Sequence, residues 1–286
     1  MGRYRKLLVA VDGSESSFHA LRESFKLAAS EKSWITVVSV VPPYEGDLAL
    51  VGIGNIQHAL RYPCEKALSE AGEVAESERA LIKTVCEEGE PHARIIDLAE
   101  AENVDLIVMG RKGLDRIERA LVGSVTARVI GYSEKDVLVV PGNAAVGWQR
   151  VLLATDGSKY SNAATERAIG FTGAYGGTMK VVAVVDVPAE FYGEAPDAVE
   201  DLVRKAKGNA ESVRKQAEKA GIPTEVFVKE GETHRAIIDL AMEQKVNTII
   251  MGSHGRTGLR RLLMGSVAEK VIGYAPCPVL IVKGRV

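Results

Sequence analysis

The sequence predicts an α/β protein made of two tandem domains, each a five-stranded parallel sheet flanked by helices. The first observation is an internal repeat: the segment from Gly89 to Val140 aligns without gaps on Gly231 to Val282, with about half of the positions identical. The second is that short apolar runs alternate with helical patterns. The third is that these runs are rich in β-branched residues and almost continuously apolar, which is typical of strands buried on both faces. Together they predict two doubly wound open sheets.

The repeat also predicts where the domains begin and end. Residues 5–14 return as residues 150–158, which predicts domains at 1–143 and 149–286. The joint between them, residues 141–147, is rich in small residues and lacks hydrophobic periodicity, as expected of a linker. A chain of 286 residues gives each domain enough length for a core of its own.

The elements of the two copies follow in the same order. The predicted strands are 6–11, 35–41, 80–86, 105–109 and 137–140 in the first copy, and 151–155, 180–185, 225–229, 247–251 and 279–282 in the second. The predicted helices include 92–102 and 235–244, and two short ones, 125–130 and 267–272, that we expect to end at Gly131 and Gly273. The charge-rich stretches 65–88 and 200–219 indicate solvated helix faces.

Composition excludes several classes of function. The chain is 46% hydrophobic and 26% charged, with a formal net charge of −2, so nothing favours nucleic acid or an anionic membrane as a partner. No apolar run is long enough to cross a bilayer, and the N-terminus does not predict a signal peptide. The three cysteines form no CxxC or metal-ligand spacing, and their odd number favours free thiols in a reducing cytoplasm.

Small and polar residues follow the strands whose carboxyl ends meet at one edge of such a sheet. The first strand of each copy ends in Asp-Gly-Ser, at Asp12 and Asp156. The fourth strand is followed by Gly-x2-Gly-x9-Gly-Ser, and in both copies a helical pattern comes next. Glycines let the main chain approach an anion closely, and a helix start supplies unpaired N–H donors. Because ligands of open α/β sheets bind at this edge, the repeated spacing predicts a phosphate cradle.

The full spacing, found twice and each time between a strand and a helix, resembles the universal stress protein family, whose ATP-binding members carry Gly-x2-Gly-x9-Gly-(Ser/Thr). The resemblance covers essentially the whole chain, including the strand-1 aspartates and Pro276-Cys277-Pro278-Val279. It implies Rossmann-like domains of the adenine nucleotide alpha hydrolase type, and a cytoplasmic, regulatory or stress-protective protein. The implied ligand is ATP, ADP or AMP, accompanied by Mg²⁺ or Mn²⁺, although no dedicated metal cage is evident in the sequence.

The resemblance also implies roles for individual residues. A valine late in strand 2 holds the adenine edge, the end of strand 1 lines the adenosine pocket, and the fourth-strand loop holds the phosphates. In the second copy these residues are Ala154, Thr155, Asp156, Val184, Met251, Gly252, His254, Gly255, Gly265, Ser266 and Val267. In the first copy they are Ala10, Val11, Asp12, Val40, Met109, Gly110, Gly113, Gly123, Ser124 and Val125.

The first copy departs from the family pattern. Arg111 and Lys112 replace Ser253 and His254, and acidic residues enter the nine-residue segment at 115 and 118. Carboxylates near a triphosphate repel it unless basic neighbours offset them. We therefore expect nucleotide in the second copy and a scaffold role for the first.

Structural readings remain open beside the functional ones. The glycines could serve only tight turns, and Asp12 and Asp156 could cap the helices that follow them. His92 and His234, each in Gly-Glu-x-His before a helix, favour a structural role over proton transfer. The glycines at 52 and 54 have no strand directly before them and predict a flexible cover rather than a dinucleotide fingerprint.

Other functions also remain open. The chain lacks a Walker A motif, His-x-x-x-His, Gly-x-Ser-x-Gly and a Cys/His pair in context, so we expect slow ATP hydrolysis or self-phosphorylation, for example on Ser266, at most. An adenylating or pyrophosphatase enzyme would need a Ser-Gly-Gly-type loop after strand 1, which the chain does not supply. A module that binds no nucleotide is the third alternative. The copies could pair as an intramolecular pseudo-dimer through strands 137–140 and 279–282, and tandem chains could form a homodimer.

Overall fold

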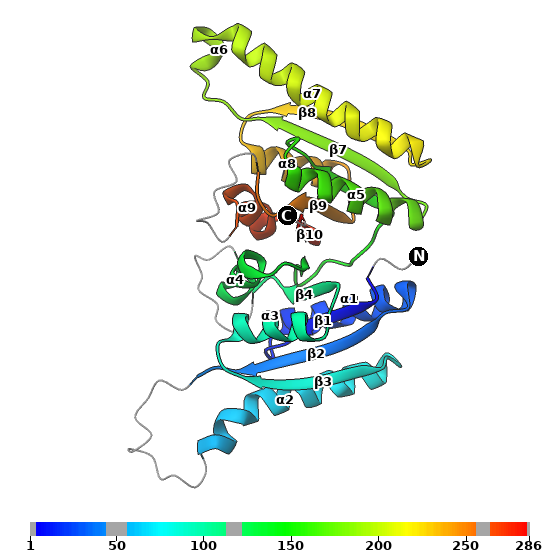
Figure 1. Ribbon diagram of the computed structural model, residues 1–286, viewed down its shortest axis with the longest axis vertical. Coiled ribbons are helices and arrows are strands. Elements are labelled where there is room, and N and C mark those ends of the chain that lie inside the picture. Colours follow the sequence, from blue (N-terminus) through cyan, green and yellow to red (C-terminus); the bar gives the residue numbers. More distant parts are fainter. Residues whose placement is uncertain (1–3, 44–55, 113–121, 256–263, 285–286) are drawn as a thin grey trace. The chain divides into compact units, whose positions relative to one another are not determined.

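The computed structural model describes residues 4–43, 56–112, 122–255 and 264–284. The chain divides into two compact units, Met1–Asn143 and Ala144–Val286, which we call the first and the second copy. Each copy is a parallel sheet with helices on both faces, as the sequence predicts (Figure 1).

The first copy alternates strands and helices from end to end. Its elements are β1 (Lys6–Ala10), α1 (Glu15–Glu31), β2 (Trp34–Val41), α2 (Ile56–Ser77), β3 (Ile82–Glu88), α3 (Pro91–Ala101), β4 (Leu106–Gly110), α4 (Ser124–Tyr132) and β5 (Asp136–Val140). The strand order is β3-β2-β1-β4-β5, and all the pairs are parallel. The winding reverses between β1 and β4, so the carboxyl ends of these two strands mark the expected ligand edge.

The second copy repeats this plan, and here the structure also describes a short helix between β7 and α7. Its elements are β6 (Arg150–Ala154), α5 (Lys159–Ala174), β7 (Thr178–Val185), α6 (Phe191–Glu194), α7 (Pro196–Lys219), β8 (Thr224–Glu230), α8 (Thr233–Glu243), β9 (Thr248–Gly252), α9 (Ser266–Tyr274) and β10 (Val279–Val282). The strand order is β10-β9-β6-β7-β8, again with parallel pairs, and the winding reverses between β6 and β9.

The central strands form the core of each copy. Leu7, Leu8 and Val9 of β1 are at most 1% exposed, and Leu152 and Leu153 of β6 are fully buried. In the first copy α1 and α2 contact each other on one face of the sheet, and α3 and α4 contact each other on the opposite face. Because both faces are covered, β1 and β6 are apolar at consecutive positions, and this pattern made them predictable.

The loops after β1 and β6 turn sharply into helices. Gly13 and Gly157 have φ values of 84° and 76°, which glycine adopts without a steric penalty. The helix caps are Ser14 and Ser158, whose hydroxyl oxygens accept from the N–H groups of Ser17 and Ser161. The reading of the preceding aspartates as helix caps is therefore wrong.

Two other expectations from the sequence are wrong. The short helices α4 and α9 continue through Gly131 and Gly273 and end at tyrosines, because neither glycine adopts the left-handed conformation that would end the helix. The expectation of three free thiols also fails, because Cys64 and Cys86 form a disulfide and only Cys277 is free. Packing of α2 against β2 and β3 brings the two cysteines together, with 6.2 Å between their Cα atoms.

Two expectations lie outside the described residues: the cover around positions 52 and 54, and the acidic positions 115 and 118. Among the helices that the structure describes, none is long and apolar enough to span a membrane.

Candidate functional site

A cavity of about 430 Å³ opens at the carboxyl edge of the sheet in the second copy. It lies where β6, β7 and β9 end and where α8 and α9 begin, next to the point at which the winding reverses. All the positions predicted for the second copy line it: Ala154, Thr155, Asp156, Val184, Met251, Gly252, His254, Gly255, Gly265, Ser266 and Val267. The fold thus brings together residues that are far apart in the sequence.

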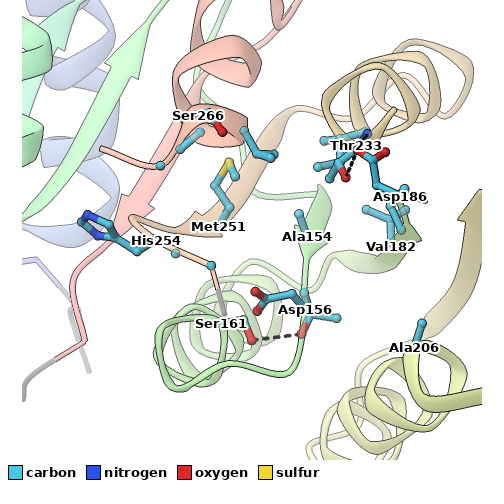
Figure 2. Close-up of a pocket in the computed structure, with 18 of the residues that line it drawn as sticks. Ala154, Asp156, Ser161, Val182, Asp186, Ala206, Thr233, Met251, His254 and Ser266 are labelled. Carbon is cyan, nitrogen blue, oxygen red and sulfur yellow. Dashed lines mark hydrogen bonds between the residues drawn. The ribbon is translucent and has the colours of Figure 1, made fainter. Parts of the chain in front are cut away.

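The lining changes in character across the cavity. Figure 2 shows Asp186 and Val182 on one side, His254 and Ser266 on the opposite side, and Ala154 between them. The first side is largely apolar and includes Leu202, Ala206 and Ile237 of the neighbouring helices. The second side consists of the glycine-rich loop and the start of α9. The cavity therefore has an apolar end and an end built from main-chain groups.

At the apolar end of the cavity, β7 extends beyond the end of β6. The last residue of β6, Ala154, pairs with Val182 of β7, and the N–H of Thr155 donates to the carbonyl oxygen of Val182 at 2.9 Å. Since every second residue of a strand directs its N–H and C=O to the same neighbour, those of Val184 point toward the space beyond the end of β6. They form a donor and acceptor pair at the edge of the cavity.

The glycine-rich loop leaves no room for side chains at its first glycine. A Cβ at Gly252 would lie 2.9 Å from the carbonyl carbon of Tyr160 at the start of α5, and a Cβ at Gly110 would lie equally close to the main chain of Ser16. A Cβ at Gly255 would be 3.0 Å from a carboxylate oxygen of Asp156. These glycines let the loop pack directly against the start of the first helix and the strand-1 aspartate.

We expect Gly252→Ala to lower the free energy of unfolding by about 1–3 kcal/mol, because the added methyl group would have to displace main chain. The matched control is Gly208→Ala in α7, where an added Cβ would have no neighbour within 4 Å. There the smaller entropy of the unfolded chain should stabilise the protein by about 0.4–1 kcal/mol. Urea unfolding of both variants measures the two shifts, and equal shifts would contradict the close contact at Gly252.

The start of α9 provides the donors of the second side. Gly265 is the N-cap, and its own N–H donates to the carbonyl oxygen of Ser253 at 3.1 Å, so this amide closes the loop and is not free for a ligand. The N–H groups of the next residues, Ser266 and Val267, lie in the first turn, where a helix provides no acceptor. The amide of Gly265 is therefore not a free donor, and those of Ser266 and Val267 are the candidates for a ligand.

Sequence reasoning missed about half of the lining. The residues that it missed are Ser161, Val182, Val185, Asp186, Val187, Leu202, Ala206, Thr233, Ile237, Ser253 and Ala268. Several of them are neighbours of predicted residues on the same strand or loop, so the same motifs could have been used to predict them. Leu202 and Ala206 come from α7, whose position against β7 and β8 only the tertiary fold defines.

In the first copy, the described counterparts lie at the corresponding strand ends and helix start: Ala10, Val11, Asp12, Val40, Met109, Gly110, Gly123, Ser124 and Val125; Gly113 lies outside the described residues. The surroundings differ. Arg111 takes the place of Ser253, and its partial burial lowers the pKa of its guanidinium. The hydroxyl of Thr126 donates to the carbonyl oxygen of Gly110 at 3.2 Å, whereas the second copy has an alanine at this position. A cavity of about 460 Å³ in this copy lies at the opposite edge, around Lys6, Trp34 and Leu81.

The recurring histidines occupy structural positions. His234 is 8% exposed, lies 3.3 Å from a carboxylate oxygen of Glu232, and has its ring 6.3 Å from that of Tyr274. His92 is placed in the same way beside Tyr132, with the ring centroids 5.8 Å apart. These contacts join α8 to α9 and α3 to α4, which supports the structural reading. The described part of the chain contains no group of three or more His, Cys, Asp or Glu residues that could hold a metal ion.

These features define a class: a tandem, doubly wound α/β protein with a pocket at the strand ends of its second copy. Residues 3–141 and 147–283 each match the model of the universal stress protein family, and the chain belongs to this family.

Several relatives match one copy or the whole chain. Universal stress protein MJ0531 of Methanocaldococcus jannaschii is 36% identical over 48% of this chain and 82% of its own length. A universal stress protein of Mycolicibacterium smegmatis is 24% identical over 98% of this chain and 97% of its own length. The crystal structure of a universal stress protein from Archaeoglobus fulgidus covers 98% of this chain and 96% of that one, at 24% identity and a TM-score of 0.75. This similarity confirms the tandem fold.

Proposed function

We propose that the protein binds ATP in the cavity of its second copy and serves a regulatory or stress-protective role. The observation that carries the proposal is the order of the groups along the cavity. Main-chain groups of Val184 and an apolar wall suit a purine, Asp156 suits ribose hydroxyls, and the first-turn amides of α9 suit phosphates. Nucleotide-binding sites of open α/β sheets have this general layout.

Three features favour the second copy over the first. Asn209 of α7 donates to the carbonyl oxygen of Asp156 at 3.3 Å, and an added Cβ at Gly157 in the same loop would clash with the Asn209 side chain. An added Cβ at Gly13, the counterpart of Gly157 in the first copy, would meet no atom within 4 Å. The small Ser253 stands where the first copy has an arginine. At this edge of the sheet, described residues of the second copy form a cavity lined by the positions that the sequence predicts.

A divalent cation fits the proposal without a protein cage. Mg²⁺ usually keeps several waters and binds through one or two carboxylates together with phosphate oxygens. Phosphate oxygens and water supply the ligands in such a site. We propose that Mg²⁺ or Mn²⁺ enters with the nucleotide.

The test is calorimetric titration of ATP into the purified full-length chain, with and without Mg²⁺. We expect one ATP bound per chain, and no nucleotide at the first copy. ADP and AMP should bind more weakly, since each lost phosphate removes charge-assisted hydrogen bonds to the start of α9. Absence of binding heat for all three nucleotides, together with no nucleotide released on denaturing the purified protein, would refute the proposal.

We also propose a cytoplasmic location, which cell fractionation tests. The disulfide between Cys64 and Cys86 is the feature that argues against it, because disulfides seldom persist in reducing compartments. Trapping of thiols at the moment of lysis would show whether the bond exists in the cell.

A further inference from the structure

A hydrogen-bonded pair, Asp186 and Thr233, stands at the apolar end of the cavity, and the proposed function leaves it without a role. Asp186 directly follows β7, and Thr233 is the first residue of α8. One carboxylate oxygen, Oδ2, accepts from both the N–H and the hydroxyl of Thr233, each at 3.0 Å. Both residues line the cavity, and Figure 2 shows the pair beside Val182, on the side away from His254 and Ser266.

The two hydrogen bonds fix the carboxylate. With Oδ2 bonded to two donors of Thr233, the remaining oxygen, Oδ1, has no hydrogen-bond partner among the described residues. An ionised carboxylate only accepts hydrogen bonds, so Oδ1 is an acceptor with a set position. A ligand group that faces it must be a donor.

The strand direction shows which part of a base would face Asp186. Along β7 the N–H of Val184 precedes its C=O, and Asp186 lies two residues further on. Side chains two residues apart leave a strand on the same face. A purine that pairs its Watson–Crick edge with Val184 therefore directs the substituent at C6 toward the C=O of Val184 and then toward Asp186. Adenine has an amino donor at C6, whereas guanine and hypoxanthine have a carbonyl acceptor there.

We propose that Asp186, positioned by Thr233, makes this site selective for a 6-amino purine over a 6-oxo purine. The inference rests on the proposed nucleotide site and adds its base specificity. One amino hydrogen of adenine is donated to the carbonyl oxygen of Val184 and the second to Oδ1 of Asp186. A 6-oxo group would instead face two acceptors and form neither hydrogen bond, so a 6-oxo purine should bind more weakly. Because Asp186 is exposed to solvent, its share of this difference is moderate.

The first copy lacks both members of the pair. Pro42 takes the place of Asp186, and Pro91 takes the place of Thr233. Proline has neither a carboxylate nor an N–H, so neither the fixed acceptor nor the donors that would hold it can form there. The difference at this pair provides a further reason to expect adenine nucleotides in the second copy.

The experiment compares the dissociation constants of ATP and ITP, which carry an amino and a carbonyl group at C6 respectively. In Asp186→Asn the two donors of Thr233 should bind the amide oxygen, so that the amide NH₂ faces the base. The acceptor thereby becomes a donor. We expect ATP to bind more weakly and ITP more tightly, so that the preference for ATP falls by about tenfold or more.

Two further variants separate a specific role from a structural one. Thr233→Val keeps the N–H but loses the hydroxyl, so the preference for ATP should fall by a smaller factor while both nucleotides still bind. Asp197→Asn, an exposed carboxylate in the first turn of α7, makes the same change in charge outside the cavity lining and should leave the preference unchanged.

The outcomes are distinct. If the wild type binds ATP and ITP equally, or if Asp186→Asn weakens both by the same factor, the inference is overturned while the nucleotide site stands. If Asp186→Asn does not fold, Thr233→Val decides, and an unchanged preference in that variant overturns the inference. If the wild type binds neither nucleotide, the proposed function itself fails.

Discussion

Gly265→Val should weaken ATP binding by about 100-fold, whereas Gly123→Val should leave it unchanged. Gly265 lines the cavity as the N-cap of α9, in an extended conformation that any residue adopts. A Cβ there would lie 3.4 Å from the carbonyl oxygen of Ser253, an ordinary contact, so the fold should tolerate the change. The branched valine would instead shield the first-turn amides from phosphate. Loss of one or two charge-assisted hydrogen bonds of about 1.5–3 kcal/mol each corresponds to about this factor.

The matched variant decides between the copies. Gly123 is the N-cap of α4, and its N–H donates to the carbonyl oxygen of Arg111 just as that of Gly265 donates to Ser253. Calorimetry of both variants, with unfolding curves to confirm the fold, gives the comparison. Equal loss in both would place ATP in both copies. Full binding in both would show that the start of α9 does not hold the phosphates.

The sequence alone was sufficient for the fold because each copy consists of local patterns that agree with one another. The central strands β1 and β6 are buried on both faces and were predicted to within one residue of each end. For the edge strand β3 the sequence predicts 80–86, but the strand runs from Ile82 to Glu88. Its residues are mostly half-buried or exposed, so hydrophobicity marks its ends poorly.

The site was predictable only where a motif contained it. Glycines and small residues at strand ends follow from main-chain geometry, and their spacing repeats in both copies. The pair of Asp186 and Thr233 depends on the distance between a strand end and a helix start 47 residues later, which spacing does not reveal. The spacing of the cysteines does not reveal the disulfide either, because Cys64 and Cys86 meet only when α2 packs against β3.

The disulfide should contribute strongly to the stability of the protein. We expect reduction of the bond between Cys64 and Cys86 to lower the free energy of unfolding by about 3 kcal/mol. The two residues are separated by 22 positions, and a cross-link of this span restricts the unfolded chain by roughly that amount in the loop-entropy model. Urea unfolding with and without dithiothreitol measures the difference. In Cys64→Ala, which has no bond to break, the reductant should change nothing.

Thiol counting tests the same bond directly, since only Cys277 is free. Burial raises the pKa of its thiol to about 12, so this group should stay protonated and unreactive toward Ellman's reagent at pH 8 in the folded protein. We therefore expect no reactive thiol in the folded chain, one after unfolding in urea, and three after unfolding and reduction. Three thiols without reductant would mean that the paired cysteines are only neighbours, and the stabilisation expected from the bond would then disappear with it.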